Sequence, residues 1–192
     1  LDNDEDIGTA QSAYLEFKGV PILPIPPMGF LLSEKRKSGF LPPTLGLDNT
    51  NGLEVVTPYY WNIAPNRDAT ISPTFMAARG VNLTSEFRYL EPDYSGVVKT
   101  SVLPNDPLRG ADRWGLAVKH QDRLDTQQGA VGWGLNLNRV SDDNYWRDFP
   151  KAGLSLSQRL LPASGSLTWS QGDFSMMTQV LQFQTLQDIS SP

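Results

Sequence analysis

The stretch Thr57–Leu90 sets the pattern that most of the chain repeats. In its second half, one set of alternate positions is mostly apolar and the other is polar: Val81, Leu83, Ser85, Phe87 and Tyr89 against Asn82, Thr84, Glu86 and Arg88. A period of two places such sets on opposite faces of a β-strand. Because Ala77–Gly80 separates this segment from the one before it, we expect two long antiparallel strands here.

Further strand patterns follow one another along the rest of the chain. We expect strands at Leu53–Trp61, Arg67–Ala77, Gly80–Glu91, Gly96–Leu103, Arg113–Arg123, Ala130–Val140, Ala152–Leu161, Gly165–Gln171 and Phe174–Gln187. Clusters of Pro, Gly, Asn and Asp separate them, including a turn predicted at Pro162–Gly165. No window of about 11 residues has a convincing helical period. The pattern predicts an all-β antiparallel meander.

The apolar strand faces are compatible with two environments. Trp114, Leu116 and Val118 share one face of their strand, and the side chains opposite them are small or charged. A soluble β-sandwich has the same alternation. The predicted strands are about 8–12 residues long, whereas strands of soluble sheets usually have ~5–6 residues. This length favours a membrane barrel. So do the Tyr and Trp residues near strand ends (Tyr59, Tyr60, Trp61, Tyr89, Tyr145, Trp146). A short Ala78–Arg79 turn alternates with longer connections at Pro104–Asp112 and Ser141–Lys151, also as in outer-membrane barrels.

Composition excludes several other classes of protein. The 192 residues carry a net charge of -5, whereas a nucleic-acid-binding domain usually has a basic surface. There is no cysteine, so disulfide frameworks and cysteine chemistry are excluded within this sequence. No apolar run approaches the ~20 residues of a membrane-spanning helix. Since the sequence begins at Leu1 without Met, we expect a piece of a longer protein.

The first part of the chain differs from the rest. Gln11–Lys18 alternates like one strand, and four prolines (Pro21, Pro24, Pro26 and Pro27) follow within a short stretch. Proline cannot donate to a β-ladder and favours extended backbone before it, so we expect a stiff connector. Lys35, Arg36 and Lys37 form the densest cationic site; they are either a solvated loop or possible contacts to lipid phosphates.

The residues offer little to catalysis. His120 is the only histidine, so a zinc site lacks its usual ligands and a strand-end histidine is the simpler interpretation. Asp142 and Asp143 are adjacent in a loop and do not flank a substrate as paired glycosidase carboxylates must. We expect no enzymatic activity, no metal and no cofactor.

Several motifs resemble one known family. They are Lys18–Pro21, Lys35–Pro42, Pro58–Pro73, Arg79–Gly80 and Glu86–Leu90, followed by Val140–Asp142, Tyr145–Trp146 and Asp148–Phe149. Together they resemble the lipopolysaccharide-assembly (LptD) family, also called organic solvent tolerance or OstA proteins. The resemblance covers about Lys18–Phe149 and is most specific at Pro58–Leu90; beyond Ala152 the sequence is only compatible with it.

The resemblance implies a periplasmic β-jellyroll joined to an outer-membrane barrel of roughly 26 strands. Residues 1–32 would then be the end of the jellyroll and the proline-rich junction, and residues 33–192 the first strands of an incomplete barrel. It also implies lipopolysaccharide as the transported molecule, a plug lipoprotein of the LptE family, a periplasmic bridge protein bound through the jellyroll, and surrounding outer-membrane lipids.

Within that family architecture, particular residues acquire expected roles. Pro58 and Pro73 each remove a ladder N–H from the first two barrel strands, and this predicts a lateral gate at the seam with the last strand. The simpler interpretation is two prolines that shape a bend. Asn82, Thr84, Glu86 and Arg88 are expected to face a hydrated lumen. The junction residues Pro21, Ile22, Leu23, Pro24, Ile25 and Phe30 are expected either to pass lipid chains from jellyroll to barrel or to pack a hinge.

Two other functions fit the same strand pattern. A soluble β-sandwich could recognise glycans through Trp114, Trp133 and Trp169. A different outer-membrane barrel, such as a porin, would share the strand pattern but would lack the proline-rich junction. A chain that stays soluble without detergent and binds sugars would favour the first of these.

Overall fold

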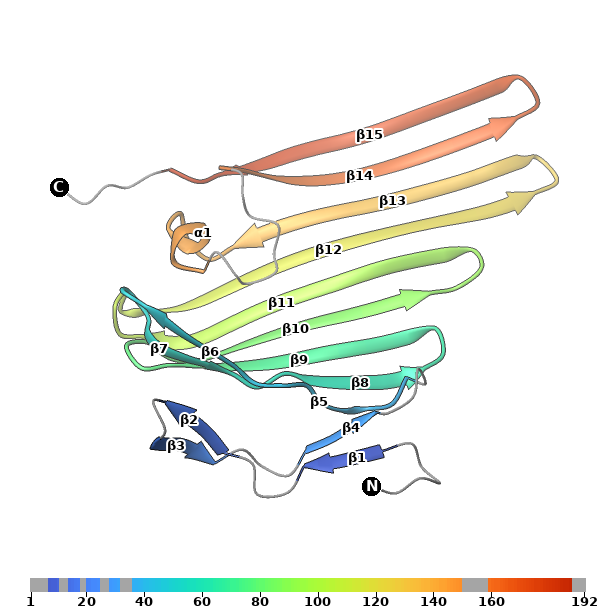
Figure 1. Cartoon of the computed structure of the whole chain (residues 1–192). Helices are drawn as coiled ribbons and strands as arrows, with labels where there is room; N and C mark the ends of the chain where they lie inside the picture. The colour runs from blue at the N-terminus through green and yellow to red at the C-terminus, as the bar shows by residue number, and fades with distance from the viewer. Residues whose placement is uncertain are drawn as a thin grey trace.

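A computed structural model describes the backbone of residues 7–10, 14–17, 20–24, 28–31, 36–149 and 159–187. The first four strands form two small antiparallel pairs, β1 (Ile7–Ala10) with β4 (Met28–Leu31) and β2 (Tyr14–Phe17) with β3 (Val20–Pro24). All later strands of the described chain belong to one 11-stranded sheet (Figure 1).

The large sheet is antiparallel, and from Tyr59 onward it is a meander in chain order. Its strands are β5 (Gly39–Phe40), β6 (Thr44–Asp48), β7 (Gly52–Val56), β8 (Tyr59–Ala64), β9 (Arg67–Met76), β10 (Gly80–Leu90), β11 (Tyr94–Asp106), β12 (Ala111–Thr126), β13 (Gly129–Val140), β14 (Leu160–Gln171) and β15 (Phe174–Thr185). From β8 to β15 each strand pairs with the next, whereas β5 pairs with β8 and β7 pairs with β9. The all-β prediction is therefore confirmed.

Tight turns connect most neighbours. Gly80 (φ 106°) and Gly129 (φ 111°) begin strands in a backbone region that only glycine adopts at low cost. They follow the turns at Ala77–Arg79 and Gln127–Gln128, so a glycine at the end of the turn favours each of these two hairpins. Among the described residues the one helix is α1 (Tyr145–Asp148), and no helix there is long and apolar enough to cross a membrane.

Two strand predictions need correction. The expected strand Leu53–Trp61 is divided at Thr57–Pro58 into β7 and β8, which both pair with β9. The turn expected at Pro162–Gly165 is instead continuous strand within β14. Pro162 lies just outside the β13–β14 ladder, whose last pair is Leu137–Ala163, so its missing N–H removes no bond from that ladder.

The connections also differ from the expected alternation of short and long. Residues 104–106 and 111–112 are strand, which leaves a four-residue turn at 107–110. That turn, the turn at Ala77–Arg79 and the long connection after Val140 all join the strands at the same end of the sheet, since successive antiparallel strands reverse direction. We call it the α1 end. The opposite end, the hairpin end, carries Pro65–Asn66, Glu91–Asp93, Gln127–Gln128 and Gly172–Asp173.

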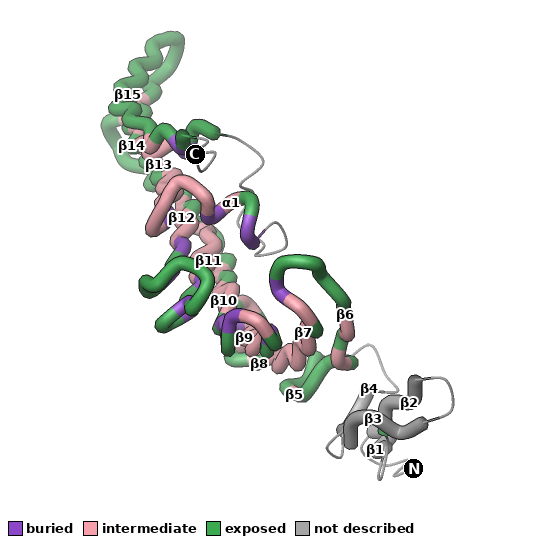
Figure 2. The backbone as a smooth tube through the Cα atoms, turned by 90° about the vertical axis from the view of Figure 1, so that its left-hand side faces the viewer, coloured by how far each residue is buried: buried purple, intermediate pink, exposed green. Residues whose placement is uncertain are grey.

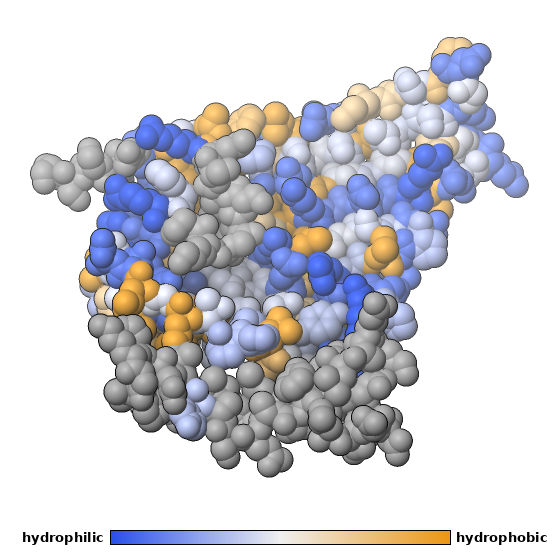
Figure 3. All heavy atoms as spheres, in the orientation of Figure 1, coloured by the Kyte–Doolittle hydropathy of each residue, from blue (hydrophilic) through white to orange (hydrophobic). Residues whose placement is uncertain are grey.

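The two faces of the sheet have different side chains. Cross-strand register places Asp68, Arg88, Val97, Lys119, Asn136 and Ser164 in one row on one face. The neighbouring row on the other face contains Ala69, Phe87, Val98, Val118 and Leu137. Seen from the side, α1 and the β6–β7 hairpin are displaced to the same side of the sheet (Figure 2). From that side, hydrophilic and neutral residues cover most of the middle of the sheet (Figure 3).

A hydrophobic core exists at the α1 end. Met76, Leu103, Val140, Tyr145, Phe149, Leu161 and Leu186 are buried together there. Elsewhere many large apolar side chains stay exposed, and β15 is exposed along almost its whole length (Figure 2). The sheet is therefore a single layer over most of its described area, with no second sheet packed on its apolar face.

Candidate functional site: the polar face and the first strand edge

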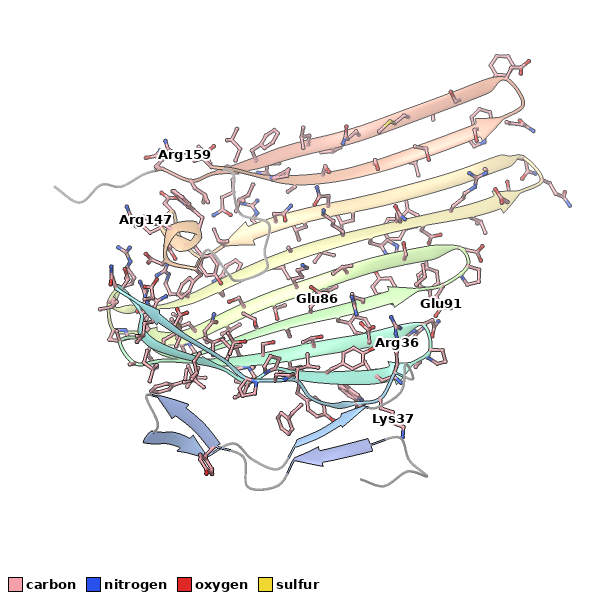
Figure 4. All side chains as sticks on the ribbon, in the orientation of Figure 1. Arg36, Lys37, Glu86, Glu91, Arg147 and Arg159 are labelled. Carbon is pink, nitrogen blue, oxygen red and sulfur yellow. The ribbon has the colours of Figure 1, made fainter. Side chains whose placement is uncertain are left out.

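The predicted lumen residues share the polar face of β10. Arg88 donates hydrogen bonds from Nε and Nη2 to the two oxygens of Asp68, at 2.7 and 2.9 Å. Glu86 lies 2.9 Å from the ammonium of Lys99. Figure 4 labels Glu86 near the middle of the sheet. These charges are paired across strands, so this face presents neutralised pairs rather than isolated charges.

The other two residues of this group lie nearer the α1 end. Thr84 donates from its hydroxyl to the carbonyl oxygen of Ser72 at 3.2 Å. Asn82 is buried and accepts a hydrogen bond from the Ser101 hydroxyl at 3.0 Å. All four residues thus share one face, as the alternation predicted, and all four already contact neighbouring strands.

A hollow of about 800 Å³ lies along the polar face towards the hairpin end. Arg36, Asp68 and Arg88 line it from one side, and Lys119 and Asn136 line it further along the sheet. Its far part is bordered by small side chains and glycines: Gly132, Gly134, Ser164, Ser166 and Thr168. Its charged, amide and hydroxyl side chains can hydrogen-bond to water and to hydroxyl-rich ligands. Among the described residues, no cluster of three or more His, Cys, Asp or Glu side chains could hold a metal ion.

The two predicted gate prolines occupy different positions relative to the first expected barrel strand, which the structure divides into β7 and β8. We call this segment the first strand. In an antiparallel pair the N–H and C=O of one residue point to the same side. Pro73 O accepts a hydrogen bond from Thr57 N at 3.1 Å, so the missing donor of Pro73 faces the β7–β8 junction. Pro58 O accepts from Leu41 N at 2.8 Å, so the missing donor of Pro58 faces the outward edge. The two gaps in the hydrogen-bond pattern are therefore one strand apart.

The predicted phosphate contacts fall only partly in the described chain. Arg36 points towards the polar face, where its guanidinium lies 3.6 Å from Asp68 (Figure 4). Lys37 is exposed beside it, and Lys35 lies outside the described residues. Of the predicted junction residues, Pro21–Pro24 fall in β3 and Phe30 in β4, with only their backbone described. Ile25 lies outside the described residues.

The sequence reasoning missed a buried ionic cluster at the α1 end. Arg113 donates to Asp106 and Asp148 from Nη1 at 3.1 and 3.0 Å, and it also pairs with Asp142. Arg79 joins the cluster by pairing with Asp106 and, at 3.4 Å, with Asp148. Both guanidinium groups stack over the ring of Phe149, 5.2 and 5.1 Å from its centroid. This cluster fixes α1 on the polar face.

The electrostatics of α1 follow from this arrangement. Burial alone raises the pKa of the Asp148 carboxyl, but hydrogen bonds from Arg109 and Arg113 and the charge of Arg79 outweigh it, so its pKa lies below the ordinary value. Burial raises the pKa of the Tyr145 hydroxyl to about 12. Tyr145 is only 1% exposed, so the prediction that it belongs to an interfacial aromatic belt is wrong.

The lone histidine also lies elsewhere than expected. His120 is in the middle of β12, on the apolar face, rather than at a strand end. Its Nδ1 is 2.6 Å from the Tyr89 hydroxyl, and its ring is 4.2 Å from the Trp133 ring. Trp133 in turn donates to Asp122 at 3.1 Å. These aromatic and polar groups gather towards the hairpin end, where aromatic residues of a membrane barrel are typically found.

Comparison with known proteins agrees with the resemblance seen in the motifs. The family described as LptD protein matches residues 9–129, more than half of the chain, and the family described as LPS transport system D matches residues 111–192.

Three relatives are each called LPS-assembly protein LptD. The protein of Albidiferax ferrireducens is 60% identical over 199 residues, covering all of this chain and 25% of the relative. That of Acidovorax sp. is 56% identical and covers all of this chain and 24% of the relative. That of Cupriavidus necator is 41% identical over 97% of this chain and 22% of the relative. The chain spans about a quarter of the length of these curated relatives, and it belongs to the LptD family.

Proposed function

We propose that this chain forms part of the wall of an outer-membrane β-barrel that delivers lipopolysaccharide. The observation that carries the proposal is the contrast between the two faces of a single-layer sheet. Phe75, Trp114 and Trp133 are 44–49% exposed on the face away from α1, a large cost in water but not against lipid tails. The opposite face carries paired charges, amides and hydroxyls suited to a hydrated lumen. A β-sandwich glycan binder would instead need a second sheet over the apolar face.

The seam for lateral release would lie at the first strand. Pro58 removes a donor from its outward edge, and Pro73 removes one from its pairing with β9. Each lost hydrogen bond is worth only ~0.5–1.5 kcal/mol in water, whereas unpaired backbone in hydrocarbon costs several kcal/mol. Having fewer bonds to break would therefore favour opening at this strand over any other described pair.

The remaining roles follow from this placement. Asn82, Thr84, Glu86 and Arg88 would line the lumen and meet sugar groups or a plug lipoprotein of the LptE family. Residues 1–32 would form the end of a periplasmic jellyroll and the proline-rich junction, with Pro21–Ile25 and Phe30 along the lipid path. A bridge protein would bind through the rest of that jellyroll. Lys35, Arg36 and Lys37 would contact phosphate groups, although Arg36 also pairs with Asp68. The chain would have no catalytic role.

The test uses the full-length protein in cells that depend on it. Replacing both prolines (Pro58→Ala with Pro73→Ala) restores two ladder donors and should slow the appearance of newly made lipopolysaccharide at the cell surface. Pro162→Ala is the matched control, since the missing N–H of Pro162 removes no bond from the β13–β14 ladder, which ends at Leu137–Ala163. Surface lipopolysaccharide is followed by pulse labelling, and sensitivity to large antibiotics gives a second readout.

Two results would count against the proposal. If the double variant delivers lipopolysaccharide at the rate of the control, the seam is not at these prolines. If the full-length protein stays soluble and monomeric without detergent, the apolar face does not contact lipid and the wall assignment is wrong.

A further inference from the structure

The outward edge of the first strand is already covered by the chain's own preceding segment. We infer that Arg36–Leu41, which we call the edge strap, is a built-in cap that occupies the pairing edge of β8. While it is bound, another strand cannot form hydrogen bonds to β8 from Pro58 to Asn62. The inference concerns this edge itself; only its consequence for lipid release rests on the proposed function.

The backbone groups that face this edge are those of Pro58, Tyr60 and Asn62. Leu41 N donates to Pro58 O at 2.8 Å, and Tyr60 is the ladder partner of Gly39. The N–H of Asn62 donates to the Ser38 hydroxyl at 2.8 Å. The edge strap thus pairs with each of these three residues, with Pro58 and Tyr60 through its backbone and with Asn62 through the Ser38 side chain.

Side chains hold the edge strap in the same register. The Phe40 and Tyr59 rings, from directly paired residues, meet edge to face with centroids 5.1 Å apart. Asn62 Nδ2 donates to the carbonyl oxygen of Arg36 at 2.8 Å, and the Arg36 guanidinium reaches Asp68 on the next strand. These contacts come from both faces of the sheet, so the segment lies in the plane of the sheet as a strand would.

The next strand along the chain, β6, covers the outward edge of β7. Residues Thr44–Asp48 pair with Gly52–Val56 through five register partners, in a hairpin closed by Asp48 Oδ1 accepting from Thr50 N and Asn51 N. Within the described chain, the outward edge is therefore covered from Gly52 to Asn62, with a break only around Thr57. The two parts differ in strength, because β6 forms five pairs and β5 forms two.

An uncovered strand edge invites pairing with any other strand. In a barrel, the closing strand would need this edge, and along Pro58–Asn62 it would have to displace the edge strap. A strap that stays in place keeps this part of the seam without strand-to-strand hydrogen bonds, so lateral opening there breaks none. Pro58, at the start of this stretch, has no N–H to offer to the edge strap or to a competing strand.

The direct test is a disulfide between edge strap and β8 in the full-length protein with its partners, in intact outer membranes. Phe40 and Tyr59 are a non-hydrogen-bonded pair, the kind with the closest Cα atoms and the best geometry for a disulfide. Phe40→Cys with Tyr59→Cys should cross-link in most molecules, as identified by the linked peptide in mass spectra. Ile71→Cys with Ser85→Cys, a non-hydrogen-bonded pair between β9 and β10, is the matched positive control.

The outcomes separate clearly. A cross-link at 40–59 comparable to that at 71–85, with lipopolysaccharide delivery unchanged, supports a strap that remains bound while the barrel works. A control pair that links while 40–59 does not would overturn the inference. A 40–59 link that forms but stops delivery would confirm the strap and overturn only its consequence for release, because the edge strap would then have to leave β8 during delivery.

Amide hydrogen exchange gives a second measurement that does not depend on disulfide formation. The amides of Leu41, Tyr60 and Asn62 should be protected in the full-length protein. Ser38→Ala should speed exchange at Asn62 by about two- to tenfold, the range that corresponds to one net hydrogen bond, and Ser38→Thr should restore protection. Unprotected amides at these three positions would refute the strap. If wild-type protein instead fails to support surface lipopolysaccharide, the proposed function fails while the strap stands.

Discussion

Both ends of the large sheet have ion pairs between arginine and aspartate, but the pairs are buried at one end and exposed to solvent at the other. At the α1 end, the side chains of Arg79 and Arg113 are 1–2% exposed and share Asp106 and Asp148. At the hairpin end, Arg123 and Asp125 pair at 3.2 Å with side chains 70% and 76% exposed. Water screens the second pair, whereas the first has lost its hydration and depends on its partners. The comparison teaches that position in the sheet, not residue type, decides what each pair contributes.

The ends also differ in how the chain is held. At the α1 end, core residues and the ionic cluster fix a connecting segment on the polar face. At the hairpin end, tight turns close the strands, and aromatic residues lie on the opposite, apolar face. Figure 4 labels Arg147 and Arg159 at the first end and Arg36 and Glu91 at the second. We therefore expect perturbations at the α1 end to loosen a folded unit and those at the hairpin end to have local effects.

The largest effect should come from Arg113→Ala in the full-length protein. It leaves Asp106 and Asp148 buried with fewer partners, and breaking a buried pair in this way typically costs about 3–5 kcal/mol. Arg123→Ala, at the exposed pair, is the control and should leave stability unchanged within error. Urea unfolding of the reconstituted protein measures both, and equal losses from the two variants would remove the distinction between the ends.

Acid should loosen α1 by protonating Asp148. The pKa of Asp148 is lowered in the folded state, so the unfolded state binds the proton more readily. The stabilisation is therefore complete above the ordinary pKa, near 3.8, and is lost as pH falls through the lower folded value. Amide exchange at Asp148 and Phe149, corrected for its intrinsic pH dependence, should rise over that window. Asp148→Asn should abolish the dependence; a pH response that survives this change would assign it to another group.

Sequence patterns predicted the two faces of the strands but missed the ionic cluster at the α1 end. Alternation identified both faces of β10, β12 and β13, because a period of two depends only on local backbone geometry. The ionic cluster was missed because Arg79, the Asp106–Arg113 pair and Asp148 are far apart in the sequence, and only the register of the strands between them brings them together. The edge strap was missed for a similar reason. Its pairing is non-local, and β5 has too few residues to produce a pattern.

A glycine on the apolar face tests the hairpin end more strongly than its exposed charges do. A Cβ at Gly96 would collide with the Tyr89 ring and would lie 2.7 Å from the carbonyl oxygen of Lys119. Gly96→Ala should therefore cost about 1–3 kcal/mol through overpacking. Gly165→Ala is a matched strand control, because nothing lies within 4 Å of its Cβ position. Equal unfolding free energies for the two variants would show that the ring moves aside without cost.

The smallest effect expected is that of Tyr89→Phe, which removes the hydroxyl 2.6 Å from His120 Nδ1 while keeping the ring. One net hydrogen bond corresponds to about 0.5–1.5 kcal/mol. Tyr59→Phe, on the same face but away from His120, is the control for loss of a hydroxyl. A double-mutant cycle isolates the contact, because in a His120→Ala background the Tyr89 hydroxyl has lost this partner and Tyr89→Phe should cost nothing further. A coupling energy near zero would mean that ring packing alone holds the hairpin-end aromatics, in contrast to the polar cluster that fixes α1.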